Sequence, residues 1–264
     1  MTNERIRHPL RIFTISKNAF REAVRDRILY NLILFVLLIT ASAIFLGELT
    51  AGQESRVIVN LGLSAVLIFG TFISIFVGVS LVWKEIEKRT VYSIFSKPIG
   101  RGEFIVGKYF GLCLTLLVNV AIMGVGVGAA LLYVGGATFI ASVWAAILLI
   151  YLELTILTAV AIMFSSFSTP ALSALLTFFV FVIGHFSTSL LDLAESLGSK
   201  TAIFFFKAIY YLLPNLSHFS FISETANNMT VPVQMIGGAF LYATVYDLIL
   251  LTVTVMIFSR RNFK

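Results

Sequence analysis

The stretch 83–108, WKEIEKRTVYSIFSKPIGRGEFIVGK, is a charged segment between two long apolar runs. It carries six Lys and Arg residues together with Glu85, Glu87 and Glu103. Because charges are costly in hydrocarbon and loops rich in Lys and Arg stay cytoplasmic, the segment predicts a cytoplasmic loop over 84–105. Pro98 disfavours helical backbone at the residue before it and would end a short helix there.

The composition outside this stretch is that of a membrane protein. The chain has 264 residues, of which 59% are hydrophobic and 12% are charged. Soluble domains carry roughly 25% charged residues, so this chain cannot cover a water-facing surface. We therefore expect one all-α transmembrane domain over 1–264. With Cys113 as the only cysteine and three histidines spread along the chain, we expect no metal site. For a chain of this membrane type we also expect no nucleic-acid partner.

Six apolar runs reach the length of about 20 residues that a membrane-crossing helix needs. The predicted spans are 28–46, 61–83, 106–134, 139–164, 171–190 and 236–258. Gly135–Gly136 predicts a tight turn between the third and the fourth. A seventh run, 202–213, is too short to cross and is stopped by Pro214, so it predicts a re-entrant or interfacial helix in the outer loop 191–235.

The basic residues predict the orientation of these spans. With a cytoplasmic N-terminus, 16 of the 19 Lys and Arg residues fall on the cytoplasmic side. Only Arg56, Lys200 and Lys207 fall outside. This asymmetry predicts that both termini are cytoplasmic.

The segment 15–27, ISKNAFREAVRDR, predicts an amphipathic helix before the first span. Apolar residues such as Phe20 and Val24 share one face, and basic residues such as Lys17 and Arg21 cover the other. Such a helix lies in the membrane interface, with its basic face toward anionic headgroups. It either anchors and orients the first span only, or also touches a cytoplasmic partner.

The segment 102–109, GEFIVGKY, nearly matches the phosphate-binding loop G-x-x-x-x-G-K-[ST]. Tyr109 replaces the hydroxyl residue that would ligate Mg²⁺, and a membrane span rather than a soluble helix follows. We expect that the chain does not hydrolyse ATP by itself.

The same loop contains the pattern E-x-E-x-R-T-x₆-K-P-x-x-R-x₅-G-K, from Glu85 to Lys108. It resembles the loop after the second span in permease subunits of ATP-binding-cassette transporters of the type-2 exporter family, and is most similar to the group associated with multi-copper enzyme maturation. The resemblance covers essentially the whole chain. It implies six spans, an interfacial connecting helix and a cytoplasmic coupling helix. It also implies a bacterial or archaeal plasma membrane, a second permease subunit (homodimer or heterodimer), and separate cytoplasmic ATPase subunits that bind ATP and Mg²⁺.

In that reading the coupling segment contacts the ATPase. Its apolar side chains fill a groove and its charges set the orientation. The residues expected there are Glu85, Glu87, Arg89, Tyr92, Ile94, Phe95, Lys97 and Arg101. The alternative is an ordinary solvated loop.

Among the polar residues inside the predicted spans, three are candidates for a functional or structural role: Asn119, Glu153 and Asp247. Each acid would cost roughly 2.5–3.5 kcal/mol at the centre of a helix in the membrane, so each is expected to face protein or water. They either line a translocation path or make structural hydrogen bonds to residues such as Tyr242 and Tyr246.

Two other features of the spans have ordinary readings. A lone His185 is expected to act as a hydrogen-bonding residue. Gly124 and Gly128 form a G-x-x-x-G pair on which a neighbouring helix could approach closely.

Two further classes of function stay open. A membrane-embedded enzyme acting on a lipid-soluble substrate would use Glu153, Asp247 or His185, and needs two such groups at one depth. An accessory or sensor subunit would have the same topology without transport.

Overall fold

The computed structural model describes all residues except 1, 26, 51, 88–99, 188, 190–191, 193–195, 197–199 and 261–264. Every regular element among these described residues is a helix. Five of the described helices are long and apolar enough to cross a membrane. They are α2 (Arg27–Glu48), α3 (Glu54–Glu87), α5 (Arg101–Tyr133), α6 (Ile140–Ser165) and α11 (Val233–Arg260). The predicted class, an all-α integral membrane protein, is confirmed.

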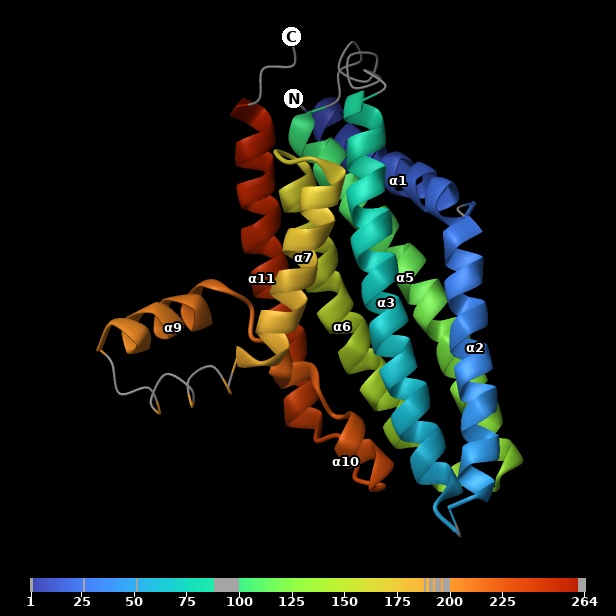
Figure 1. The fold of residues 1–264 in the computed structure, drawn as a ribbon. Coiled ribbons are helices and arrows are strands. Elements are labelled where there is room, and N and C mark those ends of the chain that lie inside the picture. Colours follow the sequence, from blue (N-terminus) through green and yellow to red (C-terminus); the bar gives the residue numbers. More distant parts are fainter. Residues whose placement is uncertain are drawn as a thin grey trace.

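The long helices form an elongated bundle (Figure 1). Helices α2, α3, α5 and α6 alternate in direction, whereas α11 runs in the same direction as α6. One end of the bundle, called here the terminal end, carries α1, the last turn of α3, the start of α5 and the end of α11. The opposite end carries the turn between α5 and the short helix η1 (Ala137–Phe139). Gly135 takes φ +79° in this turn, a backbone conformation that favours glycine, at the tight turn predicted from Gly135–Gly136.

Helix α6 is the centre of the bundle, packed by α3, α5 and α11 along its length. Leu149, Leu154 and Leu157 of α6 are completely buried. Helix α3 approaches closely because it presents glycines. A Cβ on Gly70 would lie 2.6 Å from Cδ1 of Leu154, and one on Gly78 would lie 3.0 Å from Cβ of Ala161. Small residues that let helices approach are the usual basis of packing in membranes.

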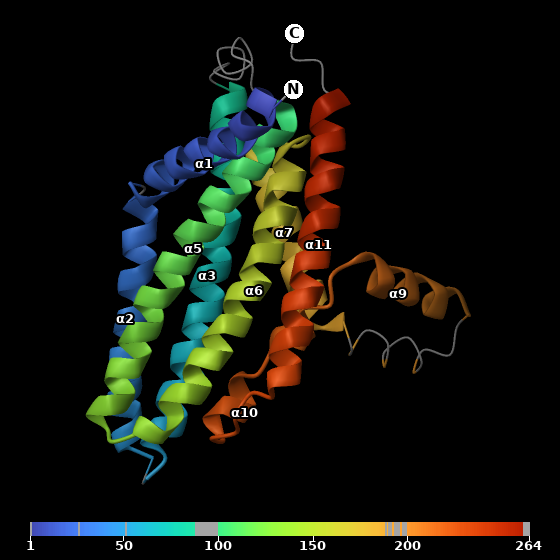
Figure 2. The same cartoon turned by 180° about the vertical axis from the view of Figure 1, so that it is seen from behind.

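Helix α1 (Thr2–Val24) is the predicted amphipathic helix and is longer than predicted at its N-terminal side. Figure 2 shows it lying obliquely across α5 at the terminal end, and it leads directly into α2. Ala19 and Ala23 on its inner face are buried, whereas Lys17 and Arg21 are exposed. The amphipathic pattern seen in the sequence is therefore present in the structure, and part of its apolar face packs against α5.

Two helices bordering the charged stretch also extend beyond the predicted spans. Helix α3 begins at Glu54 rather than 61 and runs to Glu87, and α5 begins at Arg101 rather than 106. At the start of α5 the Glu103 carboxylate accepts a hydrogen bond from the Gly100 N–H at 2.9 Å. Hydropathy marks only the residues suited to hydrocarbon. The helix itself can extend beyond them, to the point where capping groups satisfy its terminal backbone N–H and C=O groups. The predicted loop 84–105 is thus helical at 84–87 and 101–105, and 88–99 lies outside the described residues.

Of the predicted span 171–190, the structure describes one continuous helix as far as His185, and residues 188 and 190 lie outside the described part. Helix α7 (Pro170–His185) has 16 residues, about 24 Å at 1.5 Å per residue, which is short of the roughly 30 Å of hydrocarbon. The return to the opposite end is made by α7 together with η2 (Leu216–Phe219) and α10 (Ile222–Ala226). Leu216, Phe219 and Ala226 are buried, and irregular backbone at membrane depth is tolerated where protein surrounds it.

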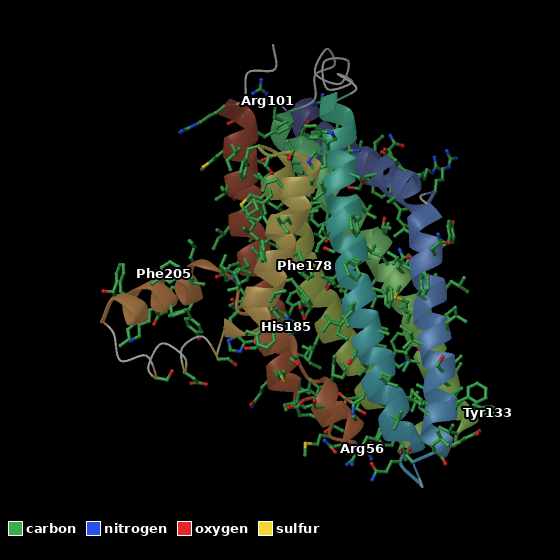
Figure 3. The ribbon with its side chains drawn as sticks, in the orientation of Figure 1. Arg56, Arg101, Tyr133, Phe178, His185 and Phe205 are labelled. Atoms are coloured by element: carbon green, nitrogen blue, oxygen red, sulfur yellow. The ribbon has the colours of Figure 1, made fainter. Side chains whose placement is uncertain are left out.

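Helix α9 (Lys200–Leu212) is the short helix predicted from the seventh apolar run. It projects sideways from the bundle and packs extensively on no other described helix (Figure 1). Phe205, labelled in Figure 3, lies on this helix and is exposed. The prediction of a short helix that does not cross the membrane fits this position.

Candidate functional site

The terminal end is held together by the contact between α1 and α5. A Cβ on Gly107 would lie 2.7 Å from Cβ of Ile15, and one on Gly111 would lie 2.6 Å from both the Ala19 Cβ and the Ser16 carbonyl oxygen. The Ser16 hydroxyl donates to the Gly107 carbonyl at 3.0 Å. Two glycines one helical turn apart therefore form the seat on which α1 crosses α5.

Two ion pairs flank this seat. The Arg11 guanidinium lies 3.8 Å from the Glu103 carboxylate, and the Lys108 ammonium lies 3.4 Å from the Glu22 carboxylate. Lys108 is only 4% exposed, and its ammonium lies 5.8 Å from the centre of the Phe104 ring. The lysine that imitates a phosphate-binding loop in the sequence is therefore a structural link between α5 and α1.

Arg101, a predicted coupling residue, joins α5 to the end of α11 (Figure 3). Its guanidinium donates to the carbonyl oxygens of Phe258, at 3.4 Å, and of Ser259. These carbonyls belong to the last turn of α11, where a cation is favoured by the helix dipole. Beneath this contact the Phe104 and Phe258 rings stack at 5.9 Å.

The remaining predicted coupling residues fall at or beyond the limit of the described part. The backbone of Glu85 and Glu87 forms the last turn of α3, and their side chains are not among those described. The others lie outside the described residues: Arg89, Tyr92, Ile94, Phe95 and Lys97. Their role in contacting an ATPase stays a prediction.

Asp247 is buried in α11 and accepts a hydrogen bond from the Tyr109 hydroxyl of α5 at 2.7 Å. Its other carboxyl oxygen has no hydrogen-bond partner among the described residues. A structural hydrogen bond to a tyrosine was one of the two expected roles, but the donor is Tyr109 of another helix rather than Tyr242 or Tyr246 of α11. Residues one or five positions apart do not face each other on a helix, so a buried carboxyl must find its partner on another helix.

Those two tyrosines instead hold the non-helical segment 213–215, which connects α9 to η2. The Tyr242 hydroxyl accepts from the Asn215 N–H at 2.8 Å, and the Tyr246 hydroxyl donates to the Leu213 carbonyl at 3.4 Å. The Asn215 side-chain oxygen accepts from the hydroxyls of Ser187 and Ser217, each at 2.6 Å. This network satisfies backbone and side-chain groups that no regular helix covers.

Glu153 of α6 is 1% exposed and faces His185, the last residue of α7. The Glu153 Oε1 and His185 Nδ1 atoms are 3.4 Å apart, and neither makes a hydrogen bond to any described residue. Figure 3 labels His185 where α7 ends. Two chemically capable groups thus meet at one depth, which the sequence did not predict because 32 positions of chain separate them.

The other predicted polar and small residues have simpler surroundings. The Asn119 amide donates to the Thr115 carbonyl of its own helix at 2.6 Å, so it serves a local structural bond. A Cβ on Gly124 would lie 2.7 Å from Ile147, but one on Gly128 would meet nothing within 4 Å. Of the predicted pair, only Gly124 therefore lies at a close helix contact, and the two glycines at which α1 crosses α5 are Gly107 and Gly111.

In the described part of the chain, no three His, Cys, Asp or Glu side chains gather as a metal site would require.

The contacts between helices that the sequence did not predict share one kind of signal. Tyr109 stands where the phosphate-binding motif requires Ser or Thr, and Gly111 lies one helical turn after Gly107. Both residues contact another helix, so a departure from a motif and a glycine at helical spacing are signals of such contacts.

Comparison with protein-family models and with curated proteins finds no match to this chain.

Proposed function

We propose that this chain is the membrane-spanning permease subunit of an ATP-binding-cassette transporter of the type-2 exporter kind. The observation that carries the proposal is the terminal end of the bundle. There α1, the end of α3, the start of α5 and the end of α11 lie together, and in the sequence α3 and α5 border the 88–99 segment. The sequence of that segment resembles a coupling loop.

The contacts at the terminal end suit a mechanical role. A push on 88–99 would act on α3 and α5 directly, because these helices border it. It would reach α1 through the Gly107–Gly111 seat and the Lys108–Glu22 ion pair, and α11 through Arg101. ATP hydrolysis in separate cytoplasmic subunits, which would hold the ATP and Mg²⁺, would drive this movement.

Transport further requires a second permease subunit, identical or related, because a path would open at the seam between two bundles. Helices α2 and α11 leave most of their surface uncovered, with Leu34, Phe45, Phe240 and Leu248 about half exposed or more. In a membrane such faces contact lipid or a second subunit. The protein would reside in a bacterial or archaeal plasma membrane with both termini cytoplasmic.

The test is co-purification with a candidate ATPase, followed by ATP turnover in lipid. Replacing Ile94 and Phe95 by Ala should uncouple turnover, because each removes apolar burial worth roughly 1–3 kcal/mol. Reversing Glu85 and Glu87 to Lys should weaken assembly, because like charges at a formed interface cost several kcal/mol.

The matched control reverses two exposed acids away from the terminal end, Glu48→Lys with Asp192→Lys, and should leave both readouts unchanged. If all four substitutions in 85–95 also leave assembly and turnover unchanged, the segment is a solvated loop and the proposal fails. Assembly without coupled transport would favour the accessory or sensor subunit.

A second candidate, the membrane-embedded enzyme, is favoured by one observation, the meeting of Glu153 and His185 at 3.4 Å. The two candidates respond differently to substitution. If the pair is structural, Glu153→Gln and His185→Gln leave ATPase coupling within a few-fold. Loss of all activity in both variants, with the fold intact by circular dichroism, would favour the enzyme.

A further inference from the structure

A groove of about 700 Å³ lies between α1 and α5, a volume typical of sites that hold small organic ligands. Its wall is apolar and comes from both helices, with Phe13 and Phe20 on α1 and Phe110 and Leu114 on α5. No other part of the described protein covers this wall, because its side chains stay exposed: 67% for Phe13, 53% for Phe110 and 43% for Leu114.

The rim of the groove is basic. Lys17 and Arg21, one turn apart on α1, line it on one side. Neither side chain forms an ion pair with any residue that the structure describes. The neighbouring acid Glu22 is directed to Lys108 across the helix contact, at 3.4 Å. Within the described part of the chain, the groove therefore presents two cations that have no acidic partner, above an apolar wall.

The groove also lies at a defined depth. Helix α1 crosses α5 at the terminal end, immediately before α2 enters the bundle (Figure 2). Phe110 and Leu114 follow Gly107 by one and two turns along α5, toward the middle of the span. The charged rim is thus at the boundary of the apolar region and the apolar wall is inside it.

We infer that this groove binds a phospholipid with an anionic headgroup. One acyl chain lies against Phe110 and Leu114, and the headgroup phosphate lies between Lys17 and Arg21. Charge complementarity selects this occupant, because a zwitterionic lipid would leave the two cations without a net counter-charge. A soluble anion would leave the apolar wall unused. The bound lipid would brace α1 against α5 beside the glycine seat.

The experiment uses the full chain purified in mild detergent. Native mass spectrometry counts the phosphatidylglycerol and phosphatidylcholine that remain bound from equal additions with identical acyl chains. We expect one tightly held phosphatidylglycerol and a preference over phosphatidylcholine of about 30-fold, from two basic contacts. Lys17→Gln with Arg21→Gln should remove the preference. The control, Lys207→Gln with Arg260→Gln, removes the same charge elsewhere and should keep it.

Three results would overturn the inference: equal retention of both lipids, a preference that survives Lys17→Gln with Arg21→Gln, or competition by soluble glycerol phosphate as strong as by phosphatidylglycerol. Leu114→Ala tests the apolar wall separately. It should weaken binding of both lipids while leaving their ratio unchanged, and an unchanged affinity would place the acyl chain elsewhere.

Discussion

At the scale of single residues, hydrogen in place of a side chain decides how α1 meets the bundle. The Gly111 position has no room for a methyl group, because the Ala19 Cβ and the Ser16 carbonyl oxygen would both lie 2.6 Å away and neither can rotate away. Gly128 on the same helix faces open space. The two glycines therefore form a matched pair for testing the contact.

We predict that Gly111→Ala has a free energy of unfolding about 1–3 kcal/mol lower than that of Gly128→Ala, the usual cost of overpacking, and therefore a lower melting temperature. Gly128→Ala should be neutral or slightly stabilising, because alanine favours helix. Cys113 is the only cysteine and is buried, so a thiol-reactive fluorophore reports unfolding directly. Equal melting temperatures for the two variants would show that α1 does not rest on Gly111.

The Tyr109–Asp247 hydrogen bond is the other residue-scale feature with a measurable consequence. Tyr109→Phe should cost about 1–3 kcal/mol, because it leaves a buried carboxyl oxygen without its donor. Adding Asp247→Leu should recover part of this loss, because removing both partners of a buried bond can be nearly neutral. Circular dichroism in detergent measures both.

Tyr151→Phe is the control, since that hydroxyl donates to the Cys113 carbonyl at a longer 3.3 Å. A double variant whose loss equals the sum of the single losses would mean that Tyr109 and Asp247 are not coupled.

At the scale of elements, α9 is distinguished by its surroundings, because it packs extensively on no other described helix. Phe204 and Phe205 are 77% and 60% exposed. With 13 residues it extends about 20 Å and cannot cross the membrane. An aromatic helix of this kind belongs in the interface, where its rings are covered by lipid.

We predict that a tryptophan at Phe205 is quenched by brominated lipid and protected from aqueous iodide. The comparison is a tryptophan at Met229, which is 56% exposed near α10 at the opposite end and should be quenched by iodide. Trp83 and Trp144 are replaced by Phe in both proteins. Iodide quenching at position 205 as strong as at 229 would place α9 in water.

At the scale of the whole molecule, the two ends of the described chain decide the number of crossings. Helices α1 and α11 share the terminal end, so the segment between α6 and α11 must return to the opposite end although α7 alone is too short. The structure achieves this with α7, η2 and α10 in series.

We predict that a cysteine at Lys97 is labelled by an impermeant maleimide only from the cytoplasmic side, and a cysteine at Met229 only from outside. Both are made in a Cys113→Ala background and assayed in intact and opened cells. The expectation follows from the basic asymmetry of the chain. Outside labelling at Lys97 would overturn the proposed orientation, and with it the cytoplasmic ATPase partnership.

The sequence by itself determined the class of the protein, the five long helices, the short helix α9 and the turn at Gly135. These follow from composition and local pattern, because the cost of placing each residue in hydrocarbon and the glycine requirement of a turn depend on neighbours in the chain. Only the tertiary structure decided that Tyr109 serves Asp247, 138 positions away, and that Glu153 meets His185. It also decided that Gly107 and Gly111 form the seat of α1, that Gly128 meets no neighbour although Gly124 does, and that the return after α6 is broken. Hydropathy measures each residue's preference for lipid, whereas these contacts depend on the rotation and crossing of whole helices, which a one-dimensional pattern does not contain.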